Sequence, residues 1–176
     1  MQSWRPVLRF RMVNRPGQSG FSPDMQRHHL LPCQVLGREV FGRLVDRLGR
    51  DTIGFEDFRR NGLLLPATEA ATRRTMLPLH RGPHRLYNEV VAERIGQIEM
   101  GWQSARGISS GDADRTALMR LDLLQRALRR RLLAPDRKPI RLNLKDPLGN
   151  LLDFAELDAL ADSLWAATAP IAEETR

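Results

Sequence analysis

The sequence contains a single cysteine, Cys33. One thiol cannot form an internal disulfide bond, and it cannot supply a zinc site built from cysteine pairs. We therefore expect a reducing, cytoplasmic setting and a fold that rests on an ordinary hydrophobic core. The sequence also lacks an uninterrupted apolar run of about eighteen residues, the length that a membrane span needs. Arginines interrupt the apolar residues of MQSWRPVLRFRMVN, so we expect no signal peptide, while export by a specialised system stays open.

Lysine is almost absent from the chain, although the chain is basic. Only Lys138 and Lys145 are lysines among 28 basic residues, and the formal net charge is +7. The planar guanidinium of arginine binds phosphate through two donors, which favours a nucleic-acid partner. A GC-rich genome would enrich arginine as well. The charge therefore agrees with such a partner without establishing it.

Histidine is also scarce, and its four copies lie in two short clusters, RHHLLP at 27–32 and LHRGPH at 79–84. Successive side chains of an extended segment point to opposite faces, so His28 and His29 are not expected to bind one ion together. One of them can bind a metal while the other takes a proton from water. Three neutral imidazoles with an open fourth position make a hydrolytic metal centre.

The second cluster has a spacing that favours one shared face. His80 and His84 are four residues apart, which places two imidazoles together on a helix. Pro83 lies between them, and the helix is therefore expected to begin near Pro83, with His84 in its first turn. Asn88, four residues after His84, is an alternative ligand to His80.

Apolar periodicity predicts a mostly helical α+β chain. The predicted elements are a strand within 1–13, a helix within 33–49, a strand at 61–66, a helix from Gly82 to about 102, a helix ending before Pro135, an extended connector at 137–150 and a last helix opening at Asp153. We expect a core unit at 1–104 and a helical C-terminal extension at 105–176 that packs on it.

Three motifs occur in an order that resembles a known family. RHHLLP, NGLLLP at 61–66 and LHRGPHRLYNEV at 79–90 resemble the AHH-type branch of the HNH/endonuclease VII superfamily of ββα-metal-finger nucleases. In that branch a His-His pair precedes a helical insert, an Asn-Gly before a strand, and an H-x-G-x-H segment followed by tyrosine. The resemblance covers about residues 26–95. Arg27 departs from it, because the branch has a small residue there.

The resemblance implies a ββα-metal-finger core with a long helical insert between its strands, and additional C-terminal helices. It implies that His28, His80 and His84 bind the metal and that His29 is the general base. Asn61 would hold the loop between the strands, and Tyr87 would position a ligand or touch the phosphate. Arg27, Arg81 and Arg85 would contact the phosphates of the nucleic acid.

The function implied is a metal-dependent endonuclease that hydrolyses DNA with little sequence preference, with RNA left open as a substrate. One divalent cation, Mg²⁺, Mn²⁺, Ni²⁺ or Zn²⁺, would stabilise the phosphorane and the leaving group. Family members often serve as toxins or in mobile elements, and a toxin would need an immunity protein. The alternatives are a non-catalytic nucleic-acid-binding module whose histidines hold a structural zinc, and a catalytically silent relative.

Some of these residues also have plain structural interpretations. Tyr87, the only tyrosine, could equally be a core residue, and Asn61-Gly62 could be an ordinary turn. Cys33 lies near the histidine pair, but its apolar surroundings predict a packed thiol rather than a ligand.

Overall fold

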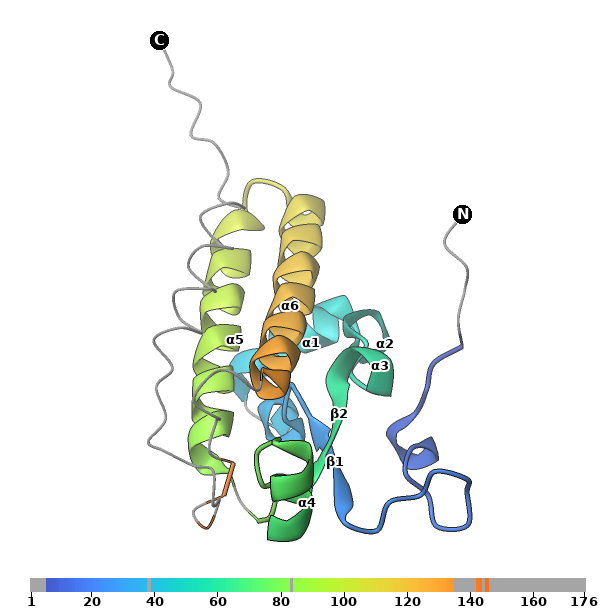
Figure 1. The fold of residues 1–176 in the computed structure, drawn as a ribbon. Coiled ribbons are helices and arrows are strands. Elements are labelled where there is room, and N and C mark those ends of the chain that lie inside the picture. Colours follow the sequence, from blue (N-terminus) through green and yellow to red (C-terminus); the bar gives the residue numbers. More distant parts are fainter. Residues whose placement is uncertain (1–5, 38, 83, 135–141, 144, 146–176) are drawn as a thin grey trace.

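The computed structural model describes residues 6–37, 39–82, 84–134, 142–143 and 145 (Figure 1). Within these residues the chain is mostly helical, with one two-stranded antiparallel sheet, which confirms the predicted α+β class. In chain order the elements are η1 Phe10–Met12, β1 Met25–His29, η2 Cys33–Gly37, α1 Glu39–Leu48, α2 Arg50–Ile53, α3 Phe58–Asn61, β2 Gly62–Pro66, α4 Glu69–Thr75, α5 Arg85–Ala105 and α6 Ser110–Leu133.

The sheet joins two segments that are distant in the sequence. β1 and β2 pair antiparallel, with His28 opposite Leu63 and His29 opposite Gly62. Leu63 and Leu65 of β2 are buried, which gives the sheet one face against the core. Elements η2, α1, α2 and α3 all lie between the two strands along the chain. Pairing therefore depends on the helical segment that brings β2 back to β1.

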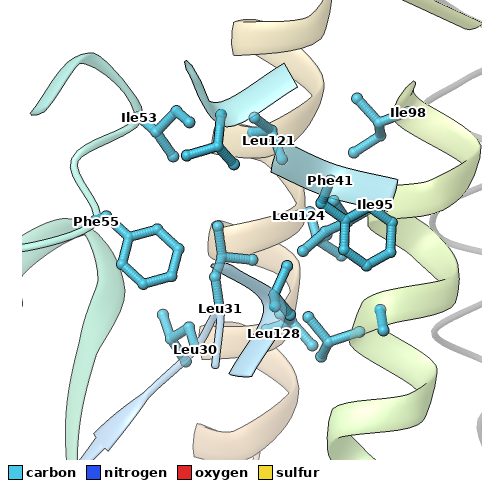
Figure 2. Close-up of a cluster of buried hydrophobic side chains, with 14 of the residues drawn as sticks. Leu30, Leu31, Phe41, Ile53, Phe55, Ile95, Ile98, Leu121, Leu124 and Leu128 are labelled. Carbon is cyan, nitrogen blue, oxygen red and sulfur yellow. The ribbon is translucent and has the colours of Figure 1, made fainter. Parts of the chain in front are cut away.

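The two long helices α5 and α6 run side by side and form the largest part of the molecule (Figure 1). Ser109 caps the start of α6, where its hydroxyl accepts a hydrogen bond from the Asp112 amide. Ile95 and Ile98 of α5 are buried in one apolar cluster with Leu121 and Leu128 of α6 (Figure 2). The core is thus shared by the helices before and after residue 104, and the division of the chain there stays a prediction.

The core also anchors the end of β1. Leu30 and Leu31 follow the histidine pair directly, and they are 0% and 1% exposed. Figure 2 shows both side chains among the buried residues, near Phe55 and Leu128. Burying two leucines contributes several kcal/mol, at about 1.5–3 kcal/mol each. Because this anchor follows His29 immediately, it limits how far the histidine pair can move.

The strand predicted within residues 1–13 is wrong for the described part of that range. Residues 10–12 form the short 3-10 helix η1, and the segment joins other backbone through a single isolated bridge between Arg9 and Asp57. The alternating pattern VLRFRMV does not produce a strand because Phe10 is buried against other side chains and does not pair in the sheet. Beside this bridge, the Leu8 carbonyl accepts a hydrogen bond from the Phe58 amide at 2.7 Å.

The other predicted elements within the described residues are confirmed with small shifts. The helix within 33–49 appears as η2 followed by α1, and the helix near Pro83 begins at Arg85. The predicted helix that opens at Asp153, and nearly all of the connector at 137–150, lie outside the described residues. No helix in the described part of the chain combines the length and the apolar character that crossing a membrane requires.

Candidate metal centre

β1 turns its two histidines to different environments. His28 is 1% exposed and faces the interior, whereas His29 is half-buried. The centroid of the His28 ring lies 4.8 Å from that of His80 and 5.1 Å from that of His84. The alternation expected of a strand therefore sends one imidazole into a histidine cluster and its neighbour away from it.

His80 and His84 reach the cluster from the segment that links α4 to α5. The His80 amide donates to the Pro66 carbonyl at 2.7 Å, which fastens this segment to the end of β2. His84 is the N-cap residue of α5. The Nε2 atoms of His80 and His84 lie 3.2 Å apart. Two nitrogens bound tetrahedrally to one ion, each at about 2.0–2.1 Å, would be separated by about 3.3 Å.

Asn88 sets the orientation of the His84 ring. Its Oδ1 lies 2.9 Å from Nδ1 of His84, and its Nδ2 donates to Gln34 Oε1 at 2.7 Å. Since an amide oxygen only accepts, Nδ1 of His84 carries the proton and Nε2 keeps its lone pair for a metal ion. Asn88, which the sequence offered as an alternative ligand, therefore is the hydrogen-bond partner of His84 in this structure.

The three imidazoles fit a divalent cation. One nitrogen from each of His28, His80 and His84 lies within 4.8 Å of the others. His28 Nε2 is buried, and no hydrogen-bond partner for it exists among the described residues. Burial lowers the pKa of His28 well below its ordinary value, and it lowers the pKa of His80 to about 4. The His28 and His80 rings are thus neutral near pH 7, and the neutral ring is the form that binds metal.

His29 lies outside the cluster and packs against an aromatic ring. Its imidazole is stacked on Phe10, with the ring centroids 3.6 Å apart and the planes 6° from parallel. Burial lowers the pKa of His29, and this outweighs the opposite effect of Glu56. The imidazole is therefore uncharged near pH 7 and able to accept a proton. Phe10 lies far from the motifs in sequence, and no pattern in the sequence indicated it.

Asn61 holds the chain that follows the histidine pair. It is 0% exposed, and its Oδ1 accepts from the Leu31 amide at 2.7 Å while its Nδ2 donates to the Phe55 carbonyl at 3.1 Å. Its own carbonyl accepts from the Leu30 amide at 2.8 Å. Gln125 of α6 donates to Asn61 Oδ1 at 3.4 Å, a contact that sequence patterns did not indicate. Asn61 is therefore buried and does not reach the surface where a substrate would bind.

Tyr87 is buried beneath the histidine cluster. Its hydroxyl donates to the Leu30 carbonyl at 2.8 Å, and its ring centroid lies 5.0 Å from that of His28. The side chain is 0% exposed, so this geometry offers no direct contact between Tyr87 and a phosphate. The packing instead places the Tyr87 ring against the His28 ring, and its role stays a prediction.

The three arginines expected to contact phosphate are all exposed. Arg81 follows His80 directly and lines a cavity of about 420 Å³ together with Lys145. Arg85 is the first residue of α5. Arg27 differs from these two, because one of its guanidinium nitrogens donates to the Phe10 carbonyl at 2.9 Å. Two of the three arginines therefore flank the histidine cluster along the chain, and Arg27 has a structural contact as well.

Cys33 is exposed, so the expectation of a packed thiol is wrong. Leu31 and Val35 take the buried positions of this turn instead. Within the described residues the group of side chains suited to a metal consists of the three histidines and does not include this cysteine.

A family model described as a nuclease family of the HNH/ENDO VII superfamily with conserved AHH matches residues 9–128. The match extends from the residue before Phe10 into α6 and includes all four histidines. Neither curated proteins nor solved structures gave a significant match.

Proposed function

Because the chain belongs to the AHH nuclease family of the HNH/ENDO VII superfamily, we propose that it is a metal-dependent endonuclease that hydrolyses DNA phosphodiester bonds with little sequence preference. One observation supports this proposal most. The imidazoles of His28, His80 and His84 converge on one point, whereas that of His29, the residue after His28 on β1, stays outside the cluster.

Each histidine has a role that its environment allows. His29 is neutral near pH 7 and half-buried, and it accepts the proton of the attacking water. A divalent cation held by His28, His80 and His84 would act as a Lewis acid that stabilises negative charge on the phosphate and on the departing 3′ oxygen. Three imidazoles suit several transition metals, so Mn²⁺, Ni²⁺ and Zn²⁺ are all to be tried. Mg²⁺, which prefers oxygen ligands, is tried beside them.

The surrounding elements supply the rest of the proposed site. β1, β2 and the start of α5 would form the ββα-metal unit, with α1 to α3 as the insert between its strands. Arg81 and Arg85, and the free part of the Arg27 guanidinium, would contact backbone phosphates. Contacts of this kind position a substrate without reading its bases, which is the reason to expect little sequence preference. A role as a toxin or mobile-element nuclease, with an immunity protein as partner in the first case, agrees with this activity.

Purified protein incubated with supercoiled plasmid and each of the four cations tests the proposal. We expect nicking that EDTA stops, and we expect His29→Ala to abolish nicking while the bound metal is retained. A module with a structural zinc would bind the plasmid and leave it intact, as would a catalytically silent relative. Single-stranded RNA in a parallel reaction decides between the two nucleic acids.

A further inference from the structure

The His29 ring is held by aromatic packing. Its face lies flat on Phe10 at 3.6 Å between centroids, and Phe55 lies 6.5 Å away at a tilt of 31°. Neither ring nitrogen of His29 has a hydrogen-bond partner within the part of the chain that the structure describes. An imidazole without such a bond rotates freely about its side-chain torsions unless packing restrains it. Here the restraint is the stack on Phe10.

A second aromatic layer supports Phe10. The Phe58 ring packs edge-on against Phe10, with centroids 5.1 Å apart. Gly62, the sheet partner of His29, has no side chain, and the Phe58 ring occupies the space that a Cβ there would need, at 2.2 Å from it. The order of packing is therefore Gly62, Phe58, Phe10 and His29.

The backbone of Phe10 is fastened on both sides. Arg27, two residues before His29 on the same strand, donates to the Phe10 carbonyl at 2.9 Å. Leu8 accepts from the Phe58 amide, and the Leu8 amide donates to the Asp57 carboxylate at 3.3 Å. Phe10 is 8% exposed. The Phe10 ring is thus buried, and hydrogen bonds hold the backbone on either side of it.

We propose that Phe10 is a positioning residue for His29, whose ring plane it fixes through the face-to-face stack, and this proposal rests on the proposed role of His29 as general base. The stack covers one face of the imidazole and leaves its nitrogen-bearing edge free to meet water. Fixing the plane removes the rotations that would turn that edge away. Misplacement of a reacting group by about 1 Å lowers the rate on the order of 100-fold.

The first test compares two substitutions of one side chain in the plasmid reaction. Phe10→Leu keeps an apolar side chain but loses the flat ring, and we expect kcat to fall on the order of 10-fold to 100-fold, with KM and metal affinity unchanged. Phe10→Tyr keeps the ring and should stay within a few-fold of wild type. Phe21→Leu, the same change at an exposed phenylalanine, is the matched control and should have no effect. Equal activity of Phe10→Leu and wild type would overturn the proposal, as would a Phe10→Tyr variant no better than Phe10→Leu.

The second test does not depend on nuclease activity. A ring stacked face-to-face shifts the protons of its neighbour upfield in the NMR spectrum. We expect the His29 ring protons to move downfield in Phe10→Leu and to stay in place in Phe10→Tyr and Phe21→Leu. A His29 signal that does not change in Phe10→Leu would disprove the stack. An inactive wild type that nevertheless gives the expected NMR shifts would instead disprove the proposed function, and with it the catalytic meaning of the stack.

Discussion

At the scale of single residues, the site depends on how neighbouring side chains of one strand separate. His28 is surrounded by His80, His84 and Tyr87, with ring centroids at 4.8, 5.1 and 5.0 Å. His29, one residue later, has an aromatic face beside it and no second histidine. In the proposed mechanism, one dipeptide thereby supplies both a metal ligand and a side chain that accepts a proton.

Asn88 gives the first prediction at this scale. Asn88→Ala removes the acceptor of the His84 Nδ1 proton, so the ring loses its fixed tautomer and orientation. Loss of such a partner typically weakens metal binding by about 10-fold to 100-fold. Titration with Zn²⁺ against a competing chelator measures this change. Asn88→Asp keeps an acceptor and should retain affinity, and Glu89→Ala, at the exposed next residue of α5, is the control. Unchanged affinity in Asn88→Ala would contradict this role.

The stability of the metal-free protein should depend on pH because of the buried imidazoles. In the unfolded chain these rings bind protons below their ordinary pKa of 6.5, whereas burial lowers the pKa of His80 in the folded protein to about 4. The unfolded state then binds more protons, so the free energy of unfolding decreases as the pH falls from about 6.5 towards 4. Burial lowers the pKa of His28 as well, which acts in the same direction.

Urea unfolding of metal-free protein at about pH 7 and about pH 4.5 measures this loss. His80→Asn removes one of the titrating rings and should reduce the difference between the two pH values. Asp24 and Asp114, whose pKa values are lowered by hydrogen bonds from Arg74 and Trp102, titrate below 3.8 and so contribute outside this window. Equal stability at both pH values would mean that the histidines are not buried as neutral rings.

The sequence predicts that the two histidine motifs meet, because successive side chains of a strand diverge and His80 and His84 are four residues apart. The choice of His28 rather than His29 for the cluster was implied by the resemblance to the family. The spacing of Asn88 from His84 indicated that the two side chains share one helix face. That Asn88 accepts a hydrogen bond from the His84 ring is evident only in the structure. No sequence pattern indicated the contact between Phe10 and His29. It meets His29 across a loop of turn-forming residues, and no periodicity relates two positions separated in this way.

At the scale of elements, the end of β1 is joined to three helical segments. The Leu30 carbonyl accepts a hydrogen bond from the Tyr87 hydroxyl of α5, and the Leu30 amide donates to the Asn61 carbonyl. Leu31 exchanges hydrogen bonds with the Asn61 side chain, whose Oδ1 also accepts from Gln125 of α6. Each of these polar groups is buried, and an unpaired one would cost about 1–3 kcal/mol. The network therefore fixes the position where the histidine strand ends, and it makes α6 a support of the site.

Gly62 allows a prediction about how the strands and α3 fit together. Gly62→Ala places a Cβ inside the Phe58 ring, although its φ of −114° is open to any residue. Such overpacking should lower the free energy of unfolding by about 1–3 kcal/mol. Gly42→Ala is the matched control, since nothing lies within 4 Å of its Cβ and alanine favours the α1 helix by about 0.5–1 kcal/mol. A Gly62→Ala variant as stable as wild type in urea would show that Phe58 is not seated there.

Element types were predictable where periodicity was strong. β2 and α6 lie where the apolar patterns placed them, because both patterns face the core. The absence of a strand within the described part of 1–13 was not predictable from the pattern, because alternating residues form a strand only when the edge of another strand is available for pairing. In the structure β1 pairs with β2, and the Phe10 ring packs against the rings of His29 and Phe58.

At the scale of the whole molecule, the charge of +7 is carried almost entirely by arginine. Binding of DNA by such a surface releases counterions, so affinity should fall linearly with salt on logarithmic axes. We expect Arg85→Ala to reduce that slope by about 1, as removal of one phosphate contact does. Arg126→Ala removes an equal charge from an exposed arginine that is already paired with Asp122, and it should change the slope much less.

This binding measurement needs a protein that does not cut its ligand. The His29→Ala background in EDTA serves that purpose, with a short DNA duplex titrated at several salt concentrations. Equal slopes for the Arg85→Ala and Arg126→Ala proteins would place the phosphate contacts elsewhere on the surface.

The central claim is that three imidazoles share one ion while the fourth stays free. X-ray absorption of the Zn²⁺-loaded protein counts the imidazole nitrogens around the metal directly. The arrangement of His28, His80 and His84 predicts three, at about 2.0–2.1 Å, with the same number in His29→Ala and fewer in His80→Ala. A fall in that number on removing His29, or a bound ion with no histidine in its shell, would contradict the claim.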